Sequence, residues 1–211
     1  MPDLEKLRKA VIEGDHKTAA AVTQEAIAEG IAPLNIVTGY LVPAMEEVGR
    51  LFECEEYFVP EMLLSARAMK ASMEVVRPLL AAAGAEPAGR VVIGTVKGDL
   101  HDIGKNLVAS MLEGGGFEVI DLGADVAPER FIEAATTRNA DVVALSALLT
   151  VTMTAMKTTI DAFTTAGLRG KVKIMVGGAP VTQQYADSIG ADGYGASAAA
   201  AVALARKLVA A

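Results

Sequence analysis

The sequence is poor in the side chains that build metal clusters and disulfides. Its 211 residues include two histidines, one cysteine and no tryptophan. The single cysteine, Cys54, cannot form an internal disulfide, which is typical of a reducing, cytoplasmic compartment. It is open to two interpretations, a metal ligand or redox thiol on one hand and an incidental residue between charged neighbours on the other. No cluster of ligands is present that would complete a zinc or iron site from protein side chains alone.

Long apolar runs and excess positive charge are also missing. No uninterrupted apolar stretch reaches the length that spans a membrane, and no segment has the basic start and apolar core of a signal peptide. The formal net charge is −7, which argues against a nucleic-acid-binding surface. We therefore expect a cytoplasmic protein that binds neither membranes nor nucleic acids.

Apolar residues are plentiful, at 52%, and over residues 1–82 they recur at helical spacing. One such stripe contains Leu41, Met45, Val48 and Phe52, and another contains Val59, Met62, Ala66, Met69, Met73, Val76 and Leu80. The methionines of these stripes are typical of a helical core. Short connections between amphipathic helices favour an antiparallel four-helix bundle.

The pattern changes after a segment of small residues at 83–89, which predicts a linker and a hinge. Beyond it, apolar runs alternate with helical stretches. The runs lie at 91–96, 117–122, 142–148, 172–176 and 191–195, and the helical stretches near 103–113, 128–138, 153–166, 180–189 and 197–209. This alternation predicts a five-stranded parallel, doubly wound sheet of the flavodoxin or Rossmann-like type. We expect two domains, an all-α bundle over 1–86 and an α/β domain over 87–211.

One histidine directly follows the first apolar run of the α/β region. His101 lies in the segment Gly98-Asp-Leu-His-Asp-Ile-Gly-Lys-Asn106, at the carboxyl end of a predicted strand, where open α/β sheets bind ligands. Asp99, two residues earlier, can accept one imidazole N–H and leave the other nitrogen free for a metal. The sequence therefore predicts that His101 is a metal ligand. Because no other cluster completes the site, the metal must bring its remaining ligands, as a macrocycle would.

Three motifs and their spacing resemble the cobalamin-binding domain family, found in methionine synthase, corrinoid mutases and the corrinoid proteins of methyltransferase systems. They are Asp99-x-His101-x-x-Gly104, Ser146-Ala-Leu148 and Gly177-Gly178, with residues 105–145 and 149–176 between them. The first motif alone is weak, because three fixed residues recur by chance; with both later motifs in register it is specific. The alternative is a flavodoxin-like domain that carries a loop histidine.

The resemblance implies that cobalamin, as methylcobalamin or a related corrinoid, binds base-off with His101 as the axial cobalt ligand. Ser146 and Thr150 are expected to contact the nucleotide tail. Thr152 is expected to donate a hydrogen bond to Asp99, at a position where the family often has serine. Backbone without side chains at the glycine pair would let the tail pass, and the alternative for this pair is a simple turn. The other residues expected at the cofactor are Gly98, Leu100, Asp102, Ile103, Gly104, Leu148, Gly177, Gly178, Gly193 and Gly195.

Phe52 and Val59 are predicted to lie at one end of the helical bundle, because one ends a helix and the other opens the next. In the family that the segment resembles, an aromatic and an aliphatic residue at these positions lie over the upper face of the corrin. An apolar lid there would keep water and oxidants from the cobalt. The alternative is that both residues only close the bundle core.

The family resemblance implies a methyl carrier rather than a complete enzyme. No segment remains for a barrel-type substrate domain or a helix-turn-helix module, since nearly every residue is assigned to the bundle or the sheet. We expect the carrier to pass a methyl group from a substrate-specific methyltransferase to an acceptor methyltransferase of the thiol or tetrahydrofolate type, with a reductive activase as a further partner. The alternative is a cobalamin-dependent regulatory or sensory module.

Overall fold

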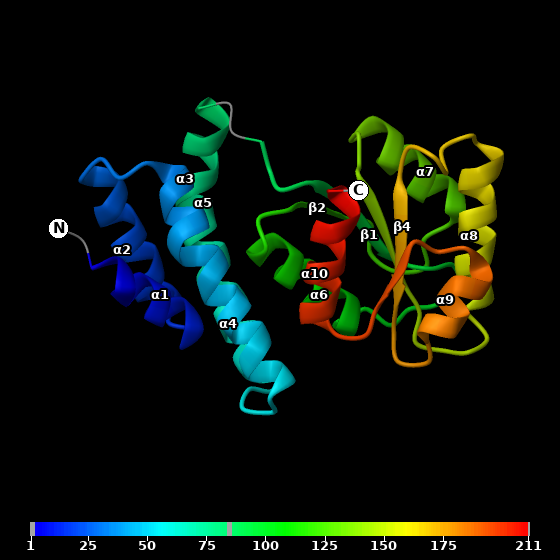
Figure 1. The fold of residues 1–211 in the computed structure, drawn as a ribbon, viewed down its shortest axis with the longest axis horizontal. Helices are drawn as coiled ribbons and strands as arrows, with labels where there is room; N and C mark the ends of the chain where they lie inside the picture. Colours follow the sequence, from blue (N-terminus) through cyan, green and yellow to red (C-terminus); the bar gives the residue numbers. More distant parts are fainter. Residues whose placement is uncertain (1–2, 84–85, 211) are drawn as a thin grey trace. The chain divides into compact units, whose positions relative to one another are not determined.

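A computed structural model describes residues 3–83 and 86–210. The chain divides into two compact units, which Figure 1 colours along the sequence. One comprises Met1–Pro87 with Glu113–Gly116, and the other comprises Ala88–Leu112 with Phe117–Ala211. Residues 84 and 85 of the predicted linker and hinge lie outside the described residues.

The first unit is helical, as predicted. Its helices are α1 (Leu4–Ile12), α2 (His16–Ala28), α3 (Pro33–Ile36), the π-helical turn η1 (Val37–Leu41), α4 (Val42–Glu53) and α5 (Val59–Ala82). Since α3, η1 and α4 follow one another without a break, the described residues form a bundle of four helical rods. Asp3 and Asp15 cap the first two helices by accepting hydrogen bonds from the N–H groups of Lys6 and Thr18.

The π-helical turn has no counterpart in the predicted helix stripes. It ends at Leu41, two residues before Pro43. Pro43 has no N–H to donate, and its ring would clash with the carbonyl of the preceding turn. A widened turn accommodates this proline within a continuous rod. The apolar periodicity of residues 41–52 therefore survives the proline. None of the helices within the described residues is long and apolar enough to cross a membrane.

The second unit is a parallel α/β sheet, which confirms the predicted fold. Its strands are β1 (Arg90–Thr95), β2 (Glu118–Asp121), β3 (Val142–Ser146), β4 (Lys173–Gly177) and β5 (Gly193–Gly195). Its helices are α6 (Ile103–Gly114), α7 (Pro128–Thr137), α8 (Thr154–Thr165), α9 (Gln183–Ile189) and α10 (Ala198–Val209). The strand order is β2-β1-β3-β4-β5, with every pair parallel.

The strand order reverses between β1 and β3, whose register pairs Val91 with Val142 and Thr95 with Ser146. From β1 the chain crosses to β2 on one side, and from β3 it crosses to β4 on the other. The loops after β1 and β3 therefore diverge at their carboxyl ends. This is the position at which doubly wound sheets bind ligands.

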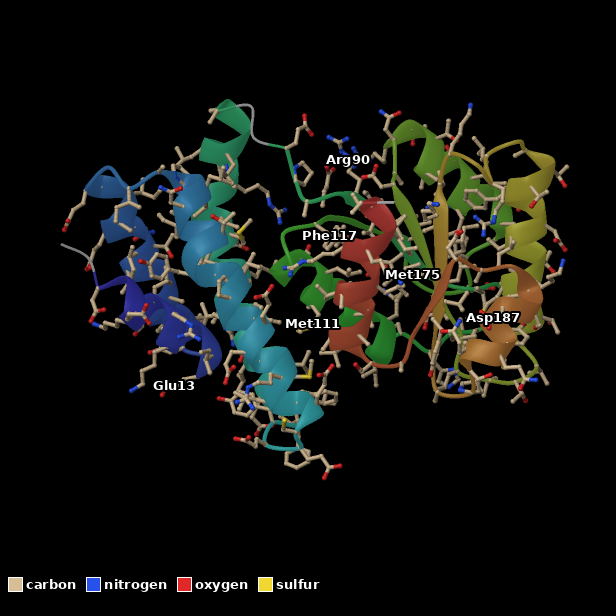
Figure 2. The ribbon with its side chains drawn as sticks, viewed as in Figure 1. Glu13, Arg90, Met111, Phe117, Met175 and Asp187 are labelled. Atoms are coloured by element: carbon tan, nitrogen blue, oxygen red, sulfur yellow. The ribbon has the colours of Figure 1, made fainter. Side chains whose placement is uncertain are left out.

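Apolar side chains cover both faces of the sheet, which explains why the central strands are continuous apolar runs. In Figure 1, α6 and α10 lie on one face, and α7, α8 and α9 lie on the other. Phe117 and Met175, labelled in Figure 2, pack in the buried cluster on the α6 and α10 side. Phe131 and Phe163 are fully buried in the cluster on the opposite side. The sheet therefore lies between two packed cores.

Candidate functional site

The His101 imidazole is oriented by the carboxylate of Asp99. His101 Nδ1 lies 2.8 Å from Asp99 Oδ1, and the His101 backbone N–H donates to the same oxygen at 3.0 Å. An ionised carboxylate only accepts hydrogen bonds, so the ring proton sits on Nδ1 and the lone pair on Nε2. The imidazole is 50% exposed, and Nε2 has no hydrogen-bond partner among residues 3–83 and 86–210. Its free nitrogen can therefore bind a metal.

The second oxygen of Asp99 is held by the loop that follows β3. Oδ2 accepts hydrogen bonds from Thr152 Oγ1 at 2.6 Å, from the Leu148 N–H at 2.8 Å and from the Leu149 N–H at 3.4 Å. Complete burial of the side chain raises the pKa of Asp99, but the hydrogen bonds from Thr152, His101 and Leu148 outweigh it and hold this pKa well below its ordinary value. The carboxylate thus stays ionised.

Two local features also fix the conformation of the loop between β1 and α6. The hydroxyl of Thr95, the last residue of β1, is buried and donates to the carbonyl of His101 at 2.9 Å. Gly98 has a φ of +86°, a conformation that favours glycine. Strand end and loop together place the imidazole at the carboxyl edge of the sheet.

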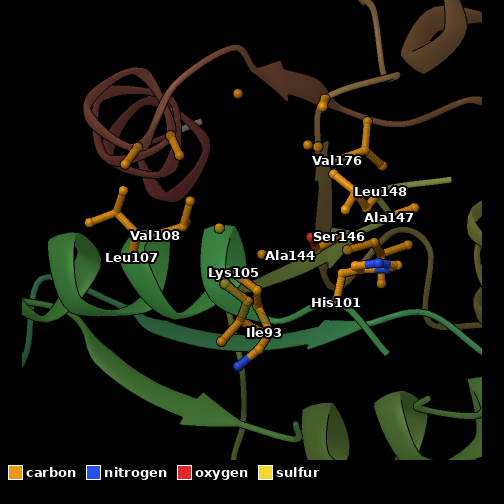
Figure 3. Close-up of a pocket in the computed structure, with 18 of the residues that line it drawn as sticks. Ile93, His101, Lys105, Leu107, Val108, Ala144, Ser146, Ala147, Leu148 and Val176 are labelled. Carbon is orange, nitrogen blue, oxygen red and sulfur yellow. The ribbon is translucent and has the colours of Figure 1, made fainter. Parts of the chain in front are cut away.

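A cavity of about 630 Å³ opens beside the imidazole. Residues of α6, α10 and the carboxyl ends of the strands line it, and Figure 3 shows His101 close to Ser146, Ala147 and Leu148 on its border. The predicted site residues that line this cavity are Leu100, His101, Asp102, Ile103, Gly104, Ser146, Leu148, Gly177, Gly178 and Gly195. The structure therefore brings all three motifs to one cavity.

Several predicted site residues lie elsewhere. Asp99 and Thr152 are behind the imidazole rather than on the cavity wall, and Gly98, Thr150 and Gly193 do not line it either. A Cβ at Gly193 would lie 2.6 Å from Leu204 Cδ1, so this glycine allows β5 to pack against α10. In the helical unit, Phe52 is half-buried at the end of α4.

Val59 is 39% exposed at the start of α5.

Two glycines of the cavity wall serve different needs. Gly178 has a φ of +129°, and a Cβ there would lie 1.9 Å from the carbonyl oxygen of Ala147. Position 178 requires glycine because the ends of β3 and β4 approach each other closely there. A Cβ at Gly104 would meet no atom within 4 Å. Because Gly104 lines the cavity, its missing side chain leaves room for a ligand.

The donor set fits a metal that arrives in a macrocycle. Within the described parts of the chain, no three His, Cys, Asp or Glu side chains are grouped to hold an ion. His101 offers one nitrogen, and a corrin supplies the equatorial nitrogens of its own cobalt. The adjoining cavity of about 630 Å³ has glycines and alanines on its walls.

Sequence analysis left Lys105 without a role, although it directly follows Gly104. Its side chain is 1% exposed, and Nζ donates to Asp121 Oδ2 at 2.5 Å and to Asn106 Oδ1 at 2.6 Å. Lys105 also lines the cavity, so its apolar stem forms part of the wall while the ammonium group joins α6 to the end of β2. Its place in the first turn of a helix, one residue after a cavity glycine, was the available signal.

Known proteins share both units. Residues 89–203 and residues 3–77 each match a family described as a B12 binding domain. The chain is 46% identical over 199 residues to trimethylamine corrinoid protein 2 of Methanosarcina acetivorans, covering 93% of this chain and 92% of that protein. It is 44% identical over 208 residues to the dimethylamine corrinoid protein of Methanosarcina barkeri, covering 98% and 97%.

A solved structure agrees with these matches. The methanol:cobalamin methyltransferase complex from Methanosarcina barkeri contains a chain with a TM-score of 0.87 and 31% identity, covering 98% of this chain and 79% of that one. Family matches, near full-length relatives and the site geometry point to one cofactor. The chain belongs to the cobalamin-binding corrinoid proteins of methyltransferase systems, and its cofactor is cobalamin.

Proposed function

We propose that this protein is a methyl carrier that binds cobalamin base-off, with His101 Nε2 as the lower axial ligand of cobalt. The observation that carries the proposal is the imidazole itself: its Nδ1 is bound to a buried carboxylate at 2.8 Å, while half of the ring is exposed beside a cavity. A histidine with this partner is held in the tautomer and orientation that a metal ligand needs.

The nucleotide tail is proposed to enter the cavity. The tail must leave cobalt if His101 takes its place, and the cavity of about 630 Å³ beside His101 would then hold it. Gly104 gives room on the cavity wall, and Ser146 offers a hydroxyl there. Gly177 and Gly195 line the cavity too, but a Cβ at either would lie 3.1–3.2 Å from protein atoms. Thr150 does not line this cavity, so we assign the tail contact to Ser146.

Bound cobalamin supplies a cobalt centre that accepts and donates a methyl group. His101 and its partner Asp99 would set how strongly the protein binds the cobalt. Asp99 makes His101 a stronger ligand, because a hydrogen bond to an anionic acceptor raises the basicity of the opposite ring nitrogen. Asp99 stays ionised behind the imidazole, because the hydrogen bonds that it accepts hold its pKa below its ordinary value.

The proposed partners are a substrate-specific methyltransferase, an acceptor methyltransferase of the thiol or tetrahydrofolate type, and a reductive activase. Two relatives are named for trimethylamine and dimethylamine, and a third belongs to a methanol:cobalamin methyltransferase complex. These names support a partner that binds a small methylated donor.

The ligand assignment is tested with protein uniformly labelled with ¹⁵N and loaded with unlabelled cob(II)alamin. An axial nitrogen from His101 gives a doublet in the electron paramagnetic resonance spectrum, whereas the cofactor's own base gives a triplet. We expect the doublet in the wild type and its loss in His101→Ala. A triplet in the wild type would show that the base stays on cobalt.

The carrier role is tested by following cobalt methylation in the visible spectrum with purified protein, a reductant and a panel of methylamines, methanol and methoxylated aromatics. We expect no saturable demethylation by the protein alone. Methylation and demethylation should appear when a donor methyltransferase and an acceptor methyltransferase are added. Rapid turnover without partners would contradict the proposal. A light-dependent change in oligomeric state without methyl transfer would favour a sensory module instead.

A further inference from the structure

Asp125 lies in the loop between β2 and α7 and contacts the backbone that carries the Asp99 side chain. Its Oδ1 accepts a hydrogen bond from the Gly98 N–H at 2.8 Å, and its own N–H donates to the Asp99 carbonyl at 2.9 Å. One residue therefore holds the Gly98–Asp99 segment at both of its ends. None of the sequence motifs includes Asp125.

The backbone of Asp125 is in an uncommon conformation. Its φ is +54°, in the left-handed region that residues other than glycine seldom adopt and that aspartate tolerates better than most. Such a conformation persists when surrounding contacts determine it, and it is concentrated at functional sites. Gly98, its hydrogen-bond partner, is also left-handed, with a φ of +86°. The two loops thus meet through two residues with positive φ, which is uncommon for Asp125 and ordinary for Gly98.

The charge of Asp125 is balanced by Lys97, the residue before Gly98. Lys97 Nζ lies 3.2 Å from Oδ1 and 3.3 Å from Oδ2. Hydrogen bonds from the Gly98 N–H and from Lys97 hold the pKa of Asp125 below its ordinary value. Val126, the next residue, bridges to Val96 in parallel. Residues 96–99 are therefore held along one side by the loop that contains Asp125.

Asp99 is consequently anchored in two places by two different loops. Thr152, Leu148 and Leu149 hold its carboxylate, whereas Asp125 holds its main chain. We infer that Asp125 is a positioning residue for the axial ligand: it sets the backbone from which Asp99 orients the His101 imidazole. This inference rests on the proposed role of His101 as cobalt ligand.

The experiment compares Asp125→Gly, Asp125→Asn and wild type in the full-length protein. Glycine suits the left-handed backbone and removes the side chain, so it isolates the Gly98 hydrogen bond from backbone strain. Asparagine keeps an oxygen acceptor for Gly98 and also tolerates this conformation. The probe is aquocobinamide, a corrinoid without a nucleotide tail, because its binding depends more strongly on the axial ligand.

We expect Asp125→Gly to weaken aquocobinamide binding about tenfold, which corresponds to about 1.4 kcal/mol, and Asp125→Asn to bind within about threefold of wild type. The ¹⁵N doublet of cob(II)alamin should lose intensity in Asp125→Gly and return in Asp125→Asn. The unfolding midpoint of the apo protein should change no more than in Asp161→Ala. That control removes a carboxylate from the exposed Lys157–Asp161 ion pair of α8, away from the site.

Two reference outcomes separate the inference from the proposed function. His101→Ala must weaken aquocobinamide binding and abolish the doublet; if it does neither, His101 is not the ligand and both ideas are wrong. If His101→Ala acts as expected while Asp125→Gly keeps wild-type affinity and doublet, the positioning role alone is overturned. Equal losses in the glycine and asparagine variants would overturn it as well, because the Gly98 acceptor is retained in asparagine.

Discussion

Thr152 and Asp99 are 53 positions apart in the sequence, and Thr152 Oγ1 donates to Asp99 Oδ2 at 2.6 Å. The same hydroxyl lies 2.8 Å from the Leu149 carbonyl, but its single proton goes to the nearer, charged acceptor. Both side chains are buried. This contact joins the loops that follow the two central strands, so the ligand loop depends on a residue beyond β3.

Removing that hydroxyl should destabilise the apo protein. Thr152→Val keeps the shape of the side chain but leaves a buried carboxylate with one donor fewer, which costs about 1.5–3 kcal/mol. Thr152→Ser restores the donor and should cost less than about 1 kcal/mol. Urea unfolding measures both. Thr158→Val, on an exposed face of α8, is the control and should stay within about 0.5 kcal/mol of wild type. Equal stabilities of Thr152→Val and wild type would contradict the assigned hydrogen bond.

Asp99 should make the apo protein sensitive to acid. Its pKa in the folded state is lowered from 3.8, so the unfolded chain binds a proton more readily than the folded chain. The stabilisation is therefore present above the unfolded pKa and is lost as the pH falls through the folded pKa. We expect the unfolding free energy of Asp99→Asn to fall less steeply than that of wild type below about pH 4. Parallel curves from urea titrations at several pH values would contradict this.

Gly178→Ala should impair folding of the α/β unit even without cofactor. The added Cβ would lie 1.9 Å from the Ala147 carbonyl oxygen, at a φ of +129°. Neither contact nor conformation can be relieved without separating the ends of β3 and β4. A loss of about 3 kcal/mol or more is expected in the unfolding free energy. A variant as stable as wild type would show that these strand ends can move apart freely.

Gly104→Ala should weaken cobalamin binding without destabilising the apo protein. No atom lies within 4 Å of the added Cβ, and alanine in a helix is up to about 1 kcal/mol more favourable than glycine. The apo protein should therefore be equally or more stable. Cobalamin affinity, measured by equilibrium titration, should fall about tenfold or more because the methyl group occupies cavity space. Unchanged affinity would place the cofactor outside this part of the cavity.

Phe52→Ala tests the lid that the family resemblance implies. An apolar ring over the upper face would exclude water and oxidants. We expect nearly unchanged cobalamin affinity with faster photolysis or oxidation of the methylated cofactor. Photolysis rates in the two proteins are the measurement. A wild-type photolysis rate together with a core-sized loss of stability, about 3–5 kcal/mol, would make Phe52 a packing residue only.

The fold was largely predictable because it depends on local periodicity. The spacing of Leu41, Met45 and Val48 describes one helix face, and the continuous apolar run at 142–145 describes a strand covered on both faces. The π-helical turn was missed, since a single proline signals a local disturbance without specifying how the helix absorbs it.

From the residue pattern alone, the site was predictable only where it is compact in sequence, whereas the Thr152–Asp99 hydrogen bond was expected from the family resemblance. Asp99 lies two residues from His101, and that spacing indicated their hydrogen bond. The contacts of Asp125 with Gly98 and of Lys105 with Asp121 join segments that only the folded sheet brings together. Gly193 was predicted at the cofactor, but its missing side chain makes room for Leu204. The sequence alone does not distinguish a glycine that makes room for a ligand from one that makes room for a neighbouring side chain.

The difference between Gly104 and Gly178 predicts which of the two glycines can be replaced during evolution. A lineage that lost the need for cobalamin would be free to replace Gly104, because nothing in the polypeptide itself requires a bare Cα there. It would still keep Gly178, whose neighbour is the carbonyl of Ala147. Homologues that no longer bind cobalamin should therefore have another residue at the position of Gly104 and still have glycine at the position of Gly178.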